Sequence, residues 1–197
     1  MKGQTLQEWA GASRIFALVF TDIVDSTTVA NQLGDEKWIE LLRKHFVQAR
    51  RLLSQCDHHE IKIIGDSFMV VFRTALEALD FALELHEETG DERIRIRIRA
   101  GVHVGPARLI EDDIFGIMVN YAKRVESTDN PSGIRLSDVA KTHITDERAQ
   151  RHDGLVYLPK QVYFKGFRAP QTTWSVSESR GRRAARLALK TNRSTLS

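Results

Sequence analysis

The sequence predicts an α+β sandwich, in which helices pack on one side of a mainly antiparallel sheet. Residues 14–21 form a nearly continuous apolar run of strand-forming residues, which is typical of a strand buried on both faces. Residues 59–64 and 67–73 are two further apolar segments, and the Gly-Asp pair between them indicates a β-hairpin. A helical pattern from about residue 35 to 54 separates the first strand from this hairpin.

The rest of the chain continues this order. Residues 93–99 alternate strictly between Arg and Ile, which predicts a strand with one apolar and one basic face. The order of elements is that of a palm-like, ferredoxin-related sheet, which many functions share. We expect helices near residues 6–10, 25–33, 35–54, 75–88, 116–127 and 138–149, and strands at 93–105, 134–137, 155–158, 161–165 and 172–176.

The distribution of charge divides the chain into three parts. The 197 residues carry a net charge of +3, which by itself favours a nucleic-acid partner. Residues 178–197 carry a net charge of +5, so residues 1–177 carry −2. We therefore expect a lead-in at 1–13, a main body at 14–177 and a flexible basic tail at 178–197, and we do not expect nucleic acid to be the main partner.

Cysteine usage and hydropathy indicate the compartment. The single cysteine, Cys56, excludes an internal disulfide framework and fits a reducing environment. The longest apolar run, Ile15 to Phe20, is far shorter than the ~20 residues that cross a bilayer. The start of the chain also lacks the pattern of a secretory signal. We expect a cytoplasmic protein without a membrane span.

Two aspartates are predicted to meet at one edge of the sheet. Asp22 ends the first buried strand, and Asp66 lies in the hairpin turn beside that strand end. Two adjacent carboxylates repel each other unless a cation lies between them, and Mg²⁺ and Mn²⁺ prefer such oxygen ligands. Taken singly, each residue also fits a structural role, Asp22 as a local cap and Asp66 as a turn former.

Five segments, in order, resemble the class III nucleotidyl cyclases, the adenylate and guanylate cyclase family. The resemblance covers about residues 14–177. The segments are LVFTDIVDST at 18–27, EIKIIGDSFMVVF at 60–72, AGVHVG at 100–105, DIFGIMVNYAKR at 113–124 and FKG at 164–166.

The resemblance implies a two-metal site. Asp22 and Asp66 match the family's metal aspartates, and the backbone carbonyl of Ile23 assists them. Two divalent cations, Mg²⁺ or Mn²⁺, would act on the α-phosphate, the ribose 3′-oxygen and the leaving pyrophosphate. Such a reaction needs no covalent enzyme intermediate, so positioning and electrostatics carry the catalysis.

The resemblance also implies how the base is read. Lys62 and Asp113 match the lysine and aspartate that bind adenine in adenylate cyclases. Adenine presents an acceptor at N1 and a donor at N6, which suits a lysine beside a carboxylate. Guanine presents the reverse pattern, and a mismatched buried polar group can reject a base by up to ~10⁴–10⁵-fold. Separately, the two residues also fit an exposed lysine and a helix-capping aspartate.

The remaining matched residues act on ribose and phosphate. Asn120 and Arg124 lie four residues apart, so they project from the same side of one helix. In the family these positions orient the ribose and stabilise charge at phosphorus, a task that suits a guanidinium. Lys165 matches the lysine that binds the triphosphate.

In this family the active site forms between two subunits. Since the chain carries both sets of residues, the resemblance implies a homodimer with two composite sites. We therefore expect an adenylate cyclase that converts ATP to 3′,5′-cyclic AMP and pyrophosphate. The alternatives are a guanylate cyclase, a catalytically silent cyclase-like module that binds nucleotide, and a nucleic-acid-binding protein.

Several residues depart from the family pattern or lie outside it. Asp25 replaces a common glycine, and we expect it to cap the following helix. Tyr121 and Lys123 are larger than the residues usual beside the Asn–Arg pair. We expect His103 to be packed and hydrogen-bonded, and the arginines of 93–99 to form a solvated face.

Overall fold

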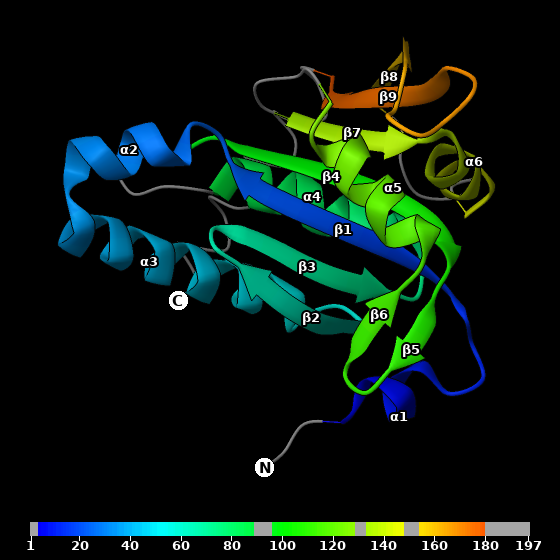
Figure 1. The fold of residues 1–197 in the computed structure, drawn as a ribbon, viewed down its shortest axis with the longest axis horizontal. Coiled ribbons are helices and arrows are strands. Elements are labelled where there is room, and N and C mark those ends of the chain that lie inside the picture. The colour runs from blue at the N-terminus through cyan, green and yellow to red at the C-terminus, as the bar shows by residue number, and fades with distance from the viewer. Residues whose placement is uncertain (1–3, 89–95, 129–132, 148–153, 180–197) are drawn as a thin grey trace.

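A computed structural model describes residues 4–88, 96–128, 133–147 and 154–179. A seven-stranded sheet has the order β2-β3-β1-β4-β7-β9-β8 (Figure 1). In this sheet β4 and β7 run parallel, and the other neighbouring strands are antiparallel. The strands are β1 (Ile15–Ile23), β2 (His58–Ile64), β3 (Ser67–Phe72), β4 (Ile98–Pro106), β7 (Gly133–Ser137), β8 (Leu155–Val162) and β9 (Gln171–Glu178). The predicted α+β class with a mainly antiparallel sheet is confirmed.

One face of the sheet is covered by three helices, α3 (Asp35–Leu53), α4 (Ala75–Glu88) and α6 (Asp138–Glu147). Their apolar side chains form one core with alternate residues of β1, β3 and β4. On β1, Ala17 and Val19 face this core, while Phe16, Leu18 and Phe20 face the other side and are also buried. The central strand is therefore buried on both faces, as its continuous apolar run predicts.

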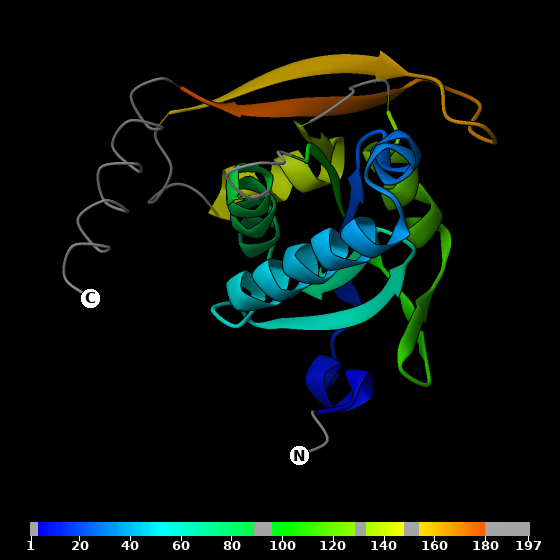
Figure 2. The same cartoon turned by 90° about the vertical axis from the view of Figure 1, so that its left-hand side faces the viewer.

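The opposite face of the sheet carries α1 (Leu6–Ala10), α5 (Ile117–Glu126) and a short hairpin of β5 (Arg108–Ile110) and β6 (Asp113–Phe115). Figure 2 shows α3 and α4 on one side of the molecule and α5 with the hairpin on the other. The prediction that helices lie on only one side is wrong. Periodicity shows that α5 has an apolar stripe, but not which face of the sheet the stripe covers.

Two strand predictions also need correction. The segments 155–158 and 161–165 were expected as separate strands, but one strand, β8, runs through Pro159. Because β8 is an edge strand, a proline without an N–H is tolerated there. The predicted strand at 93–99 is β4, which begins at Ile98; residues 89–95 lie outside the described part of the chain.

Other predicted elements agree with the structure. The short helix near residues 6–10 is α1, and the segment predicted to be helical up to Leu33 is α2 (Ser26–Leu33). Most of the basic tail, residues 180–197, lies outside the described residues. Among the described residues, no helix combines the length and apolar character of a membrane span.

Candidate active site

The structure brings Asp22 and Asp66 together at one edge of the sheet. Thr21 of β1 pairs with Phe68 of β3, so Asp22 lies beside the β2–β3 turn. This turn contains Gly65 at a φ of +64°, a left-handed conformation that favours glycine. The Asp66 carboxylate accepts a hydrogen bond from the backbone N–H of Ile23, with an N–O distance of 3.2 Å.

The Ile23 carbonyl lies on the same side of β1 as Asp66. Val24 N donates to Arg97 O at 2.8 Å, so residue 24 is hydrogen-bonded to the residue directly before β4. In an antiparallel sheet, successive residues of a strand direct their N–H and C=O groups alternately to the strand on either side. Ile23 therefore directs both groups away from β4 and toward β3 and its turn. The N–H of Ile23 does so by donating to Asp66, and its carbonyl points the same way.

The Asp22 carboxylate is buried and held at both oxygens. The Ser67 hydroxyl donates to Asp22 Oδ1 at 2.7 Å. Arg99, the register partner of Asp22 on β4, donates to Oδ2 from both Nε, at 2.9 Å, and Nη2. Burial lowers the pKa of the Arg99 guanidinium, but its hydrogen bond to Asp22 and the nearby carboxylates outweigh this, so its pKa is raised.

The donor set at this edge fits a divalent cation. A carboxylate has about four lone-pair positions. The contacts from Arg99 and Ser67 use three at Asp22, and the contact from Ile23 uses one at Asp66, counting the described residues. The remaining positions at Asp22 and Asp66, with the Ile23 carbonyl, are hard oxygen ligands that leave room for phosphate oxygens in a six-oxygen shell.

Lys62 and Asp113 form an ion pair, although they are 51 residues apart in the sequence. Lys62 comes from β2 and Asp113 from the start of β6, in a hairpin that the sequence does not predict. Their side chains are 41% and 30% exposed, so the pair is accessible to a ligand. The other oxygen of Asp113 accepts the backbone N–H of Ile114 at 2.8 Å, which fixes the orientation of the carboxylate.

Asn120, Arg124 and Lys165 lie around one aromatic cluster. Asn120 and Lys165 are exposed, and Arg124 is half-buried, with its guanidinium 5.4 Å from the centre of the Phe167 ring. The cluster joins α5 to the loop that carries Lys165. It consists of Tyr121, Phe164 and Phe167, with ring centres 5.2–6.2 Å apart in edge-to-face contacts.

His103, on β4, packs against Tyr121 of this aromatic cluster. Its Nδ1 is 2.8 Å from the hydroxyl of Ser137, and its ring centre is 4.5 Å from that of Tyr121. Burial lowers its pKa to about 4, so it is neutral at pH 7. The prediction of a packed, hydrogen-bonded histidine is confirmed. His103 and Tyr121 also line an apolar hollow of about 570 Å³ at the start of α5.

Asp25 does not cap α2 with its side chain, so that prediction is wrong. Its φ of 57° is left-handed, and its carboxylate instead pairs with Arg97 Nη2 at 2.7 Å. The prediction of a solvated arginine face is also wrong at Arg99, which binds Asp22. Arg93 and Arg95 lie outside the described residues.

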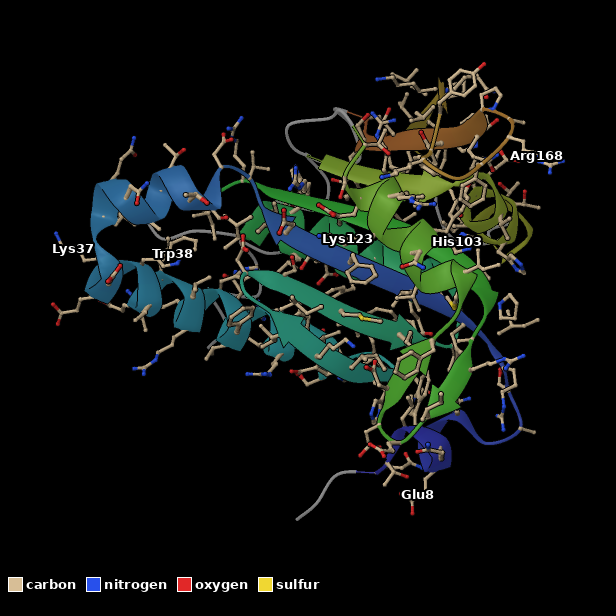
Figure 3. The ribbon with its side chains drawn as sticks, in the orientation of Figure 1. Glu8, Lys37, Trp38, His103, Lys123 and Arg168 are labelled. Carbon is tan, nitrogen blue, oxygen red and sulfur yellow. The ribbon has the colours of Figure 1, made fainter. Side chains whose placement is uncertain are left out.

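Lys123, the other departure on α5, reaches across β1 (Figure 3). Its ammonium lies 5.6 Å from the centre of the Phe20 ring and 3.5 Å from the Ser67 hydroxyl. It also pairs with Glu126 at 2.8 Å. Sequence reasoning did not identify Glu126, whose side chain is fully buried.

Comparisons with known proteins show the family and the fold of this chain. The family model of the adenylate and guanylate cyclase catalytic domain matches residues 12–178. Guanylate cyclase 32E of Drosophila melanogaster is 30% identical over 142 residues, which are 61% of this chain and 12% of that protein. The chain therefore matches only a small part of this relative.

Two solved structures have the same fold. The catalytic core of a rhodopsin-guanylyl cyclase with converted specificity, in complex with ATPαS, superposes with a TM-score of 0.72 at 24% identity, covering 84% of this chain and 96% of that one. The adenylyl cyclase CyaB from P. aeruginosa gives 0.71 at 22% identity, covering 84% and 95%.

Proposed function

The chain belongs to the adenylate and guanylate cyclase catalytic domain family, and from this premise we propose that it is an adenylate cyclase that converts ATP to 3′,5′-cyclic AMP and pyrophosphate. The observation that carries the choice of ATP is the ion pair between Lys62 and Asp113. In this pair the Lys62 ammonium is a donor and the Asp113 carboxylate is an acceptor, and both are exposed enough to contact a nucleotide base.

This donor–acceptor pair matches the edge of adenine. The Lys62 ammonium donates to N1, and Asp113 accepts from the N6 amino group. Guanine would place its own N1–H against the ammonium and its O6 against the carboxylate. Both contacts would then be repulsive or unpaired, which is how a polar site discriminates between bases.

Asp22, Asp66 and the Ile23 carbonyl would hold the Mg²⁺ or Mn²⁺ ions. When bound, two such ions polarise the α-phosphate, favour the ribose 3′-alkoxide and neutralise the leaving pyrophosphate. The chain itself contributes the fixed orientation of the two carboxylates, because Arg99, Ser67 and the Ile23 N–H hold them.

The residues around the aromatic cluster would act on the sugar and the phosphates. Asn120 orients the ribose, so that its 3′-oxygen is aligned with the α-phosphate. Arg124 donates to the phosphate oxygens on which charge develops, and Lys165 binds the triphosphate. The contact between Arg124 and Phe167 supports this role, since it orients the guanidinium before substrate binds.

We further propose a homodimer with two composite sites. The metal aspartates of one protomer would act with Lys62, Asp113, Asn120, Arg124 and Lys165 of its partner. The exposure of Asn120 and Lys165 supports this arrangement, because these side chains are free to meet another surface. Two exposed apolar residues near the start of α5, Phe115 at 47% and Ile117 at 77%, also fit a covered interface.

The test is a parallel assay of the purified protein with ATP and with GTP, each with Mg²⁺ and with Mn²⁺. We expect cyclic AMP as the main product and no detectable turnover by Asp22→Ala. Equal or greater formation of cyclic GMP would refute the assignment of ATP. Nucleotide binding without turnover at every metal concentration would instead favour a silent module.

Guanylate cyclase remains the second candidate, because the relative at 30% identity is a guanylate cyclase. The Lys62–Asp113 pair opposes it for the reason given above. The parallel assay separates the two candidates directly.

A further inference from the structure

The short helix α1 is bound to the rest of the molecule at both of its ends. At its start, the backbone N–H of Leu6 donates to Asp112 Oδ1 at 3.1 Å, although the two residues are 106 positions apart. At its end, Trp9 Nε1 donates to Asp57 Oδ1 at 2.6 Å, and the Arg73 guanidinium lies 4.3 Å from the centre of the Trp9 ring. A helix of five residues is not stable by itself in water, so these contacts hold it in place.

The contact at Asp112 joins α1 to the hairpin that carries one member of the Lys62–Asp113 pair. Asp112 lies in the turn between β5 and β6, and Asp113 is the next residue. These two strands form a sheet of their own, and a hairpin of two strands is marginally stable unless other elements support it. Figure 1 shows that the tip of this hairpin lies close to α1.

The turn of the hairpin has a backbone conformation that needs such support. Glu111 has a φ of 55°, in the left-handed region that is uncommon for a residue with a side chain. Conformations of this kind persist where the surrounding structure fixes them. The neighbouring residue, Asp112, is fixed by its hydrogen bond to Leu6, so the contact with α1 stabilises the turn.

Apolar packing connects α1 to both members of the pair. The buried side of α1 belongs to an apolar cluster that contains Ile114, the residue after Asp113. Ile61, the residue before Lys62, packs against the same cluster. Because neighbouring residues of a strand project to opposite faces, the packing of these two isoleucines determines where the two charged side chains project.

We propose that Asp112 is a positioning residue for base recognition: its hydrogen bond to α1 holds the β5–β6 hairpin where Asp113 meets Lys62. This inference rests on the proposed function for the roles of Lys62 and Asp113. It gives a function to the residues of α1, which precede the part of the chain that the family model matches, residues 12–178.

The test variant is Asp112→Ala, which removes the acceptor for the Leu6 N–H. Loss of a hydrogen bond to a charged group shifts a local equilibrium by about tenfold or more. We therefore expect amide hydrogen exchange of residues 108–116, measured by mass spectrometry without nucleotide, to become about tenfold faster. We also expect the ratio of kcat/KM for ATP to that for GTP to fall about threefold or more, mainly through a higher KM for ATP, because a displaced Asp113 discriminates less between the bases.

Two further variants serve as controls. Asp112→Asn should restore most of the protection from exchange and most of the ATP/GTP ratio, because an amide oxygen also accepts an N–H. Glu77→Ala also removes a carboxylate that binds the first turn of a helix, since Glu77 accepts from the Thr74 hydroxyl at 2.9 Å at the start of α4, on the opposite face of the sheet. Its hairpin exchange and its ATP/GTP ratio should equal those of the wild type. Thermal unfolding of all variants establishes that the same folded state is compared.

Trp9→Phe is the second variant, which decides the question if Asp112→Ala does not fold. It keeps an aromatic ring but loses the hydrogen bond to Asp57, so we expect a smaller change in the same direction. Unchanged exchange of residues 108–116 in the folded variants would overturn the inference, and so would faster exchange with an unchanged ATP/GTP ratio. If the wild type makes no cyclic nucleotide, the proposed function fails, while the exchange measurement still decides whether α1 holds the hairpin.

Discussion

The two halves of the candidate site differ in how completely one chain builds them. The acidic half consists of Asp22, buried at the end of β1, and Asp66, half-buried in the β2–β3 turn, and it is held by backbone, hydroxyl and guanidinium contacts within the chain. The cationic half, Asn120, Arg124 and Lys165, lies on a helix and a loop and is more exposed. Within it, the Arg124 guanidinium lies over the Phe167 ring, 5.4 Å from its centre.

This difference has a physical cause. Two adjacent carboxylates in a buried place repel each other, so each needs a donor of its own while no metal is bound. Exposed cations are solvated and need no such partner until a phosphate arrives. The acidic half is thus organised in the single chain, whereas the proposed function completes the cationic half with a ligand and the surface of a second protomer.

The largest expected effect comes from removing Arg124, the main cation of the cationic half. We expect Arg124→Ala to lower kcat by about 10²–10³-fold, because a donor to the developing charge is lost. The melting temperature should change little, since this side chain is only half-buried. Steady-state kinetics with ATP measures the effect, and a loss of less than threefold would show that the charge is stabilised elsewhere.

The second largest effect concerns discrimination between adenine and guanine. We expect Lys62→Glu to lower the ratio of ATP to GTP turnover, compared as kcat/KM, by about 10²-fold, because a carboxylate accepts from guanine N1–H and repels adenine N1. A competition assay with both nucleotides measures the ratio. If the ratio does not change, the Lys62–Asp113 pair does not read the base.

Acid should destabilise the support beneath the cationic half. Burial lowers the pKa of His103 to about 4, and it does the same for His45, on the buried side of α3. In the unfolded chain both bind a proton below about pH 6.5, so the unfolded state gains protons first as the pH falls. The free energy of unfolding should therefore decrease between about pH 6.5 and 4, by roughly 3 kcal/mol at most for each histidine.

Urea denaturation at a series of pH values measures this decrease. The variant His103→Gln should lose less stability than the wild type over the same range. Equal losses in the two proteins would show that His103 is not the group responsible.

The smallest effect tests the aromatic support. We expect Phe167→Leu to lower kcat about threefold, because the cation–π contact with Arg124 is worth about 0.5–1 kcal/mol at such a site. The KM for ATP should remain close to that of the wild type. A change in KM alone would mean that Phe167 supports Lys165 rather than Arg124.

The meeting of the two aspartates could be predicted from the sequence, whereas the pairing of Lys62 with Asp113 could be predicted only in part. Asp22 and Asp66 meet because a short hairpin returns beside β1, a relation that local patterns express. Lys62 and Asp113 are 51 residues apart and meet through an unpredicted hairpin, so only the family resemblance paired them.

Long-range polar contacts were the hardest to predict. The alternation of Arg and Ile implies that Arg99 lies on a polar face, but not that buried carboxylates lie opposite it. Periodicity likewise cannot tell which face of the sheet α5 covers, and the buried Glu126 lies where α5 packs closely on Gly101. Such contacts depend on packing between elements, which local sequence does not express.

The central claim, that each active site takes one half from each chain, is tested by mixing Asp22→Ala with Arg124→Ala. Each variant alone should be inactive or nearly so. Random pairing gives half of the dimers as heterodimers, each with one intact site, so we predict recovery of about a quarter of the wild-type rate. A mixture that stays inactive, although exchange of protomers is demonstrated, would contradict the claim.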